Sequence, residues 1–142
     1  LLEHFSDPQG ILTENFRILK PNGYALVDVP QKYHIYTLIK HILILINKWF
    51  AGWETEFSVW QLQQRMQTSG FAIHGRYGEW MQPSLFYRIT REILLKVGLR
   101  LPLYPPGIPG LRMLRKRIRH AKWARRLAVY TGLDLGLIGK KI

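Results

Sequence analysis

The sequence predicts an α/β fold, in which amphipathic helices alternate with short apolar strands. Residues 20–23, Lys-Pro-Asn-Gly, separate a helical pattern from the apolar run 24–29. Gly70 separates a second helical pattern from residues 71–77, where Phe71, Ile73 and Tyr77 lie on the alternate positions of a strand. Helix-breaking residues placed between helical and extended patterns are typical of αβ joints. The residues 102–110 contain four prolines in nine positions, which indicates a linker.

The first helix is predicted to begin at Asp7-Pro8, because an acidic cap followed by Pro is a common helix start. Leu12 and Phe16 then recur at helical spacing. Pro21 cannot continue the helix, and the Asn-Gly pair after it can adopt the left-handed conformation that closes a helix. The strand 24–29 that follows is short and apolar, which predicts a buried, parallel strand.

The segment 35–50 is predicted to be a strongly amphipathic helix. Ten of its apolar side chains share one half of the helical wheel, and Thr37, Lys40 and His41 lie on the other half. A bilayer needs roughly 20 apolar residues to be spanned, so this segment is too short. Three alternatives remain: a lid over an acceptor pocket, a helix that lies on a membrane surface, and an ordinary core helix.

Two further helices are predicted. Ser58 and Gln61 have the spacing of a capping box, so a helix runs from there to about Ser69. Residues 83–84, Pro-Ser, open another helix that ends near Val97. The chain is thus expected to comprise an α/β part at 1–101, the linker at 102–110 and a basic helical extension at 111–142.

The net charge of +12 is large for 142 residues, and it indicates anionic partners. Residues 111–130 combine Arg and Lys on one arc of a helix with a narrow apolar arc. This pattern suits a solvated helix packed on the domain, a helix bound to an anionic membrane, or a helix that binds phosphates of nucleic acid. Nucleic acid is disfavoured, because no aromatic stacking platform accompanies the charge.

Several kinds of site are excluded or disfavoured by composition. The chain has no cysteine, so disulfides and thiol catalysis are excluded, and its five histidines have no metal-binding spacing. No secretory signal is visible, and we expect a cytoplasmic protein, with peripheral association with a membrane as an alternative. The chain begins without Met, so we expect residues upstream of it. Nothing in the sequence specifies an oligomeric state.

The opening residues, LLEHFSDPQGILTENFRILKPNGYALVDVP, resemble the second half of class I S-adenosylmethionine-dependent methyltransferases, especially those that act on small molecules and lipids. The matching features are Leu-Glu-His at 2–4, Asp-Pro at 7–8, the helix end at 17–23 and the strand end at 29–30. Asn22 replaces the first Gly of the family pattern, and it tolerates the same backbone geometry. The resemblance continues through the helix and strand at 57–73 and covers residues 1–77.

This resemblance implies the C-terminal part of a Rossmann-like methyltransferase sheet with flanking amphipathic helices. The first strands and the Gly-rich cofactor loop are then expected upstream, and no G-x-G-x-G occurs in the sequence. The implied activity is methyl transfer from S-adenosylmethionine to a small or lipid-like acceptor, with these 142 residues inactive on their own. The alternative is a non-catalytic, membrane-peripheral module that uses the basic amphipathic helices.

Ligands of open α/β sheets bind at the carboxyl ends of the strands. In the resemblance, Glu3 and His4 follow the fourth strand, where they would meet the cofactor. His4 is the candidate catalytic residue, because an imidazole near the transferred methyl group can orient a substrate or accept a proton. It could instead cap the following helix or pack beneath the cofactor.

The acceptor is expected to meet residues that follow the strands and the long helix. The candidates are Gln31, Tyr33, Trp53 and Trp80. Asp28 lies within an apolar strand, where an unpaired carboxylate is costly. It must therefore pair with a buried Arg or lie near the end of the sheet.

Overall fold

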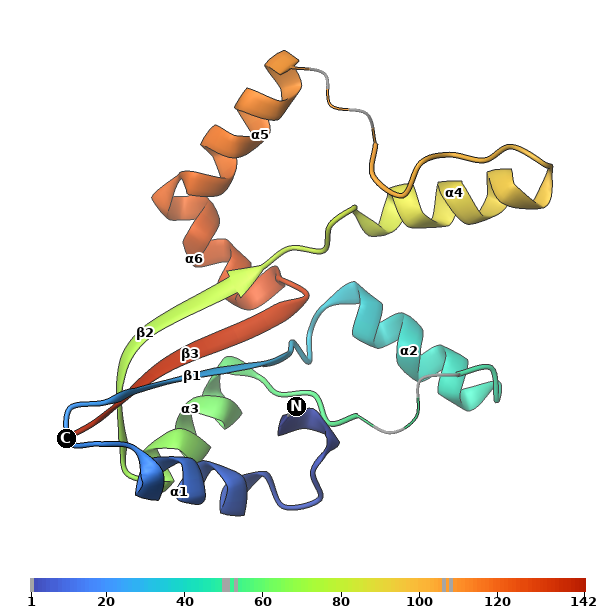
Figure 1. The fold of residues 1–142 in the computed structure, drawn as a ribbon. Helices are drawn as coiled ribbons and strands as arrows, with labels where there is room; N and C mark the ends of the chain where they lie inside the picture. The colour runs from blue at the N-terminus through green and yellow to red at the C-terminus, as the bar shows by residue number, and fades with distance from the viewer. Residues whose placement is uncertain (1, 50–51, 53, 106, 108) are drawn as a thin grey trace.

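A computed structural model describes residues 2–49, 52, 54–105, 107 and 109–142. A three-stranded sheet forms the centre, and helices surround one end and one face of it (Figure 1). In chain order the elements are η1 (Leu2–His4), α1 (Pro8–Ile18), β1 (Tyr24–Pro30), α2 (Ile35–Leu45), α3 (Val59–Thr68), β2 (Phe71–Glu79), α4 (Leu85–Lys96), α5 (Pro109–His120), α6 (Lys122–Thr131) and β3 (Asp134–Lys141).

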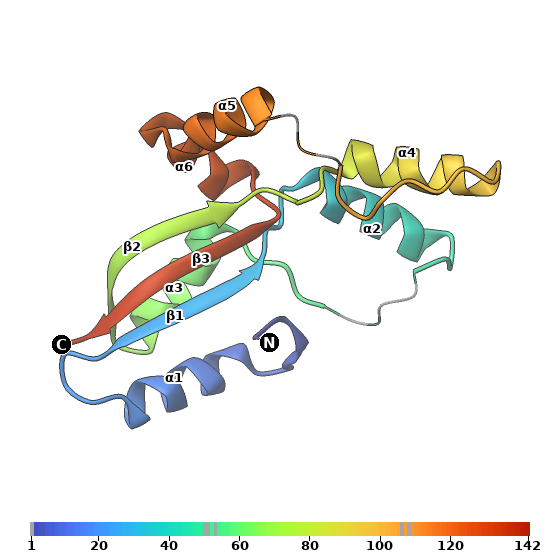
Figure 2. The ribbon, with the colours of Figure 1, turned by 45° about the horizontal axis from the view of Figure 1, so that its top comes forward.

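The strand order is β1-β3-β2, and β3 runs antiparallel to both neighbours. β1 was expected to pair with a parallel neighbour, and this expectation is wrong, because its neighbour β3 runs antiparallel to it. β1 and β2 do point the same way, but the last segment of the chain lies between them (Figure 2). Their carboxyl ends consequently meet at one end of the sheet, beside the start of β3.

Residues 111–142, expected as a basic helical extension, are helical only as far as Thr131. Helix ends at Thr131, and β3 follows as the central strand. The alternation of buried Leu135 and Leu137 with the glycine between them is a strand pattern, and pairing on both edges secures it. The helical part is itself divided in two, with a break at Ala121.

The core lies between one face of the sheet and the helices α1, α3 and α6. Leu12 of α1, together with Leu62 and Met66 of α3, packs against Leu135 and Leu137 of β3 in one buried cluster. The opposite face of β1 carries the alternate side chains, among which Tyr24 and Leu26 are exposed.

The local signals at the helix ends are confirmed. Asp7 caps α1, where its carboxylate accepts a hydrogen bond of 3.0 Å from the Gly10 amide. Asn22 has a positive φ of 62°, as the helix-closing turn requires. Ser58 and Gln61 form both hydrogen bonds of the predicted capping box.

α2 buries its polar side and exposes its apolar side, which is the reverse of an ordinary core helix. Its polar residues Thr37 and Lys40 are 4% and 3% exposed, whereas Leu38 and Leu45 are 58% and 84% exposed. The core-helix alternative for this segment is therefore wrong. The helix is also shorter than expected, because it ends at Leu45 and Asn47 turns the chain with a φ of 56°.

α4 and α5 extend away from the sheet (Figure 1). No residue of α4 is buried. Among the helices in the described ranges, none has the length and apolar character needed to cross a bilayer.

Candidate functional site

A cavity of about 170 Å³ lies where β1 ends, β3 begins and α2 passes over them. It is lined by Pro30, Tyr36, Thr37, Lys40, Trp49, Glu54, Glu56, Leu133 and Asp134. A larger hollow of about 290 Å³ is lined by Gln9, Gln61, Gln64, Arg65 and Thr68. We place the candidate site in the smaller cavity, because its wall combines three carboxylates, a buried lysine and two aromatic rings.

Gln31 fixes the position of α2 against the end of the sheet. Its side-chain amide donates a 2.8 Å hydrogen bond to the Val129 carbonyl, at the end of α6. Its own backbone carbonyl accepts a 2.8 Å hydrogen bond from the Thr37 hydroxyl. These two buried bonds tie the first turn of α2 to β1 and α6, and they turn the polar side of α2 inward.

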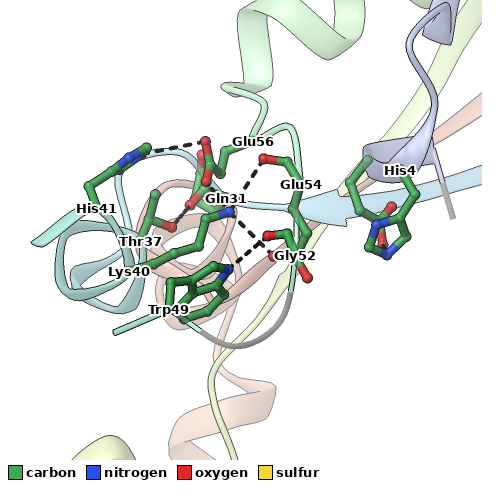
Figure 3. A network of polar contacts seen from close by, with 10 residues as sticks. His4, Gln31, Thr37, Lys40, His41, Trp49, Gly52, Glu54 and Glu56 are labelled. Carbon is green, nitrogen blue, oxygen red and sulfur yellow. Dashed lines mark hydrogen bonds and ion pairs between the residues drawn. The ribbon is translucent and has the colours of Figure 1, made fainter. Parts of the chain in front are cut away.

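Lys40 stands at the centre of the resulting network (Figure 3). Its ammonium group pairs with the carboxylate of Glu56 and lies 3.3 Å from a carboxylate oxygen of Glu54. The indole of Trp49 lies 5.7 Å from the same nitrogen. His41 approaches Glu56 from the other side, at 3.6 Å. Two carboxylates and an aromatic face thus offset the desolvation of one buried ammonium group.

A second group of acidic residues occupies the sheet face beside this cavity. Asp28 and Tyr77 lie on either side of Gly136, and the Tyr77 hydroxyl donates a 3.2 Å hydrogen bond to the Asp28 carboxylate across it. A side chain at Gly136 would overlap the Tyr77 ring. Two residues further along the strands, Asp134 of β3 lies opposite Glu79 of β2. Asp28 therefore lies near the end of the sheet with a tyrosine as its partner, and it does not pair with a buried Arg.

Each carboxylate of this group makes it harder for its neighbours to carry a negative charge. Burial and the nearby carboxylates raise the pKa of Asp28 and of Asp134 above the ordinary value. Burial and the charge of Asp28 raise the pKa of Tyr77 to about 12. This end of the sheet is an acidic region on a strongly basic protein, and it would attract a positively charged ligand group.

The structure places Glu3 and His4 in η1, at the rim of this region. The two side chains approach each other at 3.7 Å, and His4 is half exposed. The Thr55 amide donates a 2.8 Å hydrogen bond to the Glu3 carbonyl, which ties η1 to the segment that carries Glu54. Figure 3 shows His4 beyond Glu54, apart from the contacts around Lys40.

The predicted acceptor residues are dispersed. Gln31 is buried and holds elements together, and Tyr33 is exposed in the turn after it. The Trp80 indole nitrogen donates a 3.1 Å hydrogen bond to the Thr131 hydroxyl, beside α6. None of these three belongs to the cavity wall. Trp53 lies outside the described residues.

The cavity residues Lys40, Glu54, Glu56 and Asp134 were not selected from the sequence. Glu54 and Glu56 are two positions apart, and side chains at that spacing point the same way in an extended segment, so the motif Glu-Thr-Glu was a usable signal. Lys40 gave no comparable signal, because a lysine on the polar side of an amphipathic helix is normally solvated.

In the described ranges, no three His, Asp, Glu or Cys side chains are placed to hold a metal ion.

The comparisons with known proteins bear on the fold. No protein-family model and no curated protein matches the sequence. A solved structure is similar: an S-adenosylmethionine-dependent methyltransferase of Thermotoga maritima, described as a possible histamine N-methyltransferase. The identity is 18%, the TM-score is 0.56, and the match covers 99% of this chain and 52% of that one. The chain has a methyltransferase-like fold. It spans about half the length of the neighbour, so that protein's activity is not transferred with the fold.

Proposed function

We propose that this chain is the acceptor side of an S-adenosylmethionine-dependent methyltransferase. The observation that carries the proposal is the likeness of nearly the whole chain to half of a methyltransferase. The position of the cavity supports it, because ligands of α/β sheets bind beyond the carboxyl ends of the strands. The expected reaction is methyl transfer to a small or lipid-like acceptor.

The residues fit S-adenosylmethionine along one side. At the rim His4 is half exposed and Glu3 is partly buried, and the carboxylates of Asp28 and Asp134 give that rim a negative potential suited to a sulfonium cation. A Gly-rich cofactor loop does not occur in the sequence. We therefore assign the remaining cofactor contacts to residues outside these 142, and we expect the chain alone to be inactive. When bound, the cofactor supplies a methyl group that is already activated.

The protein's own contribution is then to place the acceptor. Tyr36 and Trp49 offer flat apolar walls, while Glu54 and Asp134 accept hydrogen bonds from a polar group of the acceptor. A cavity of about 170 Å³ admits a small molecule or one end of a lipid-like molecule. His4, at the rim, would orient the acceptor or take up its proton.

The test compares the 142-residue chain with a longer natural form that includes its upstream coding sequence. We expect the longer form to produce S-adenosylhomocysteine with pooled amines and phenols or with a lipid extract, and the 142-residue chain to produce none. In the longer form, His4→Ala should lower kcat, whereas the exposed His120→Ala on α5 should leave kcat unchanged.

Two results would overturn the proposal. A longer form that neither binds S-adenosylmethionine in calorimetry nor turns over would remove the enzyme assignment. Turnover by the 142-residue chain alone would remove the division between the acceptor side and the cofactor side.

A further inference from the structure

The outward side of α2 is apolar because its inward side is held by polar contacts. Thr37 and Lys40 face Gln31 and Glu56, so the helix cannot turn without breaking a buried hydrogen bond and an ion pair. Leu38, Ile42 and Leu45 are consequently exposed together. An apolar face held toward solvent by buried polar contacts marks an interaction surface.

α4 presents a second apolar stripe. Phe86, Ile89, Ile93 and Val97 recur at three- and four-residue spacing, so they share one side of the helix. Phe86 is 80% exposed and Val97 is 69% exposed, and no residue of the helix is buried. The stripe therefore has no cover in the described part of the chain.

The positive charge of the protein is concentrated beside these stripes. Residues 85–126 contain twelve Lys or Arg and one acidic residue, Glu92, for a net charge of +11 against +12 for the whole chain. In α5 every side chain from Arg112 to His120 is exposed. Met113 and Ile118 are exposed among these basic residues.

The three helices extend from the same end of the sheet. Figures 1 and 2 both show α2 and α4 beyond the end at which β1 and β2 finish, while α5 rises above the same end, joined to the sheet through α6, and the chain's C-terminus lies at the opposite end. We call the exposed apolar side chains of these helices, together with the Lys and Arg of α4 and α5, the outer surface.

We propose that the outer surface docks on an anionic lipid bilayer. Interspersed basic and apolar side chains match both parts of such a bilayer, since Lys and Arg attract the headgroups and the apolar side chains enter the acyl boundary. A second copy of the chain would bring +12 against +12, which disfavours self-association. Nucleic acid can stack on an aromatic ring, but it has no acyl layer to cover the aliphatic side chains of α2 such as Leu38, Ile42 and Leu45. The proposal does not depend on methyl transfer.

The experiment is co-sedimentation of the 142-residue chain with phosphatidylcholine vesicles, with and without about 30% phosphatidylserine, at about 0.1 M and 0.5 M salt. We expect binding to the anionic vesicles that falls at high salt. Arg115→Gln/Arg119→Gln should weaken that binding about thirtyfold. Phe86→Gln/Ile93→Gln should weaken it about tenfold.

The matched control for charge is Lys20→Gln/Arg76→Gln. Both of its residues are exposed and lie outside the outer surface, so binding should weaken less than about threefold. All of these positions are exposed, and circular dichroism should show unchanged thermal unfolding in each variant.

The proposal is overturned by absence of vesicle binding, by binding that ignores lipid charge and salt, or by α5 variants that bind like the unmodified chain. It is also overturned if light scattering shows a dimer that the Phe86 variant abolishes, since the occupant is then a second copy. Binding to RNA that outcompetes anionic vesicles would assign the charge to nucleic acid and overturn it as well.

Discussion

Lys40→Met tests the feature on which both the site and the outer surface depend, the inward orientation of α2. Methionine keeps the length of the side chain and removes the charge. Glu54 and Glu56 then lie together at the cavity wall without their shared cation. Because like charges repel and partly buried carboxylates are poorly solvated, the folded state loses stability.

The expected loss follows from the burial of the pair. Removal of one partner from a fully buried ion pair costs about 3–5 kcal/mol. Glu54 is partly exposed and Glu56 retains His41, so we expect the lower end, about 3 kcal/mol. An unfolding entropy of about 2.1 cal/mol/K per residue over 142 residues converts this into a fall in Tm of about 10 °C.

Denaturant unfolding followed by far-UV circular dichroism measures the change. The exposed Lys48→Met serves as control and should lie within about 0.5 kcal/mol of the unmodified chain. Lys40→Met/Glu56→Gln should recover part of the loss, because the second change removes a stranded charge. If Lys40→Met is as stable as the control, and the α2 amides keep their hydrogen-exchange protection, Lys40 is not the anchor of this helix and the reasoning fails.

Two other predictions concern the sheet. Gly78→Ala should lower Tm by about 3–10 °C, because overpacking against a backbone costs about 1–3 kcal/mol. A Cβ at this position would lie 2.7 Å from the Val129 amide nitrogen. Gly110→Ala is the control: a Cβ there meets nothing within 4 Å, so Tm should stay unchanged or rise slightly. Asp134→Asn should raise Tm at pH 7. Burial and the charge of Asp28 raise the folded-state pKa of Asp134, so its charged form costs stability once the pH rises past the ordinary value of about 3.9. The gain should shrink as the pH falls through the window between the raised and the ordinary pKa, and it should vanish below both.

Tm should be measured by thermal melts across pH 3 to 8, a range of about five pH units that covers the titration of carboxyl groups. This series separates the predicted pH dependence from general effects of substitution. Equal losses for Gly78→Ala and Gly110→Ala would contradict the close approach of α6 to β2. A gain for Asp134→Asn that grows toward acid pH would contradict a raised pKa for this carboxyl in the folded state.

Features that depend on a few neighbouring residues were predictable from the sequence. The Asp7 cap, the left-handed Asn22 and the capping box at Ser58 each involve groups within four residues of one another. Local sterics and hydrogen bonding decide such features wherever the segment lies. The joint between α1 and β1 was therefore predicted correctly, and the resemblance drawn from it is supported as far as a methyltransferase-like fold.

The pairing of the strands was harder to predict from the sequence. The alternation of Leu135 and Leu137 was present in the sequence, but it follows a long basic helical pattern, and a short strand gains its stability from its neighbours. The central place of β3 requires hydrogen bonds to strands that lie more than fifty residues earlier. The antiparallel pairing of β1 follows from that insertion.

By itself, the sequence determined the helix ends that local caps and turns mark, at Asp7, Asn22 and Ser58, and which two faces each amphipathic helix possesses. It did not determine which face of α2 is buried. That choice was made by the tertiary contacts of Lys40 with Glu56 and of Gln31 with Val129, which join residues 16 and 98 positions apart. A pattern along one helix separates its polar from its apolar side, but only the groups brought against it decide which side leaves water, because a buried charge is stable only where its partners are.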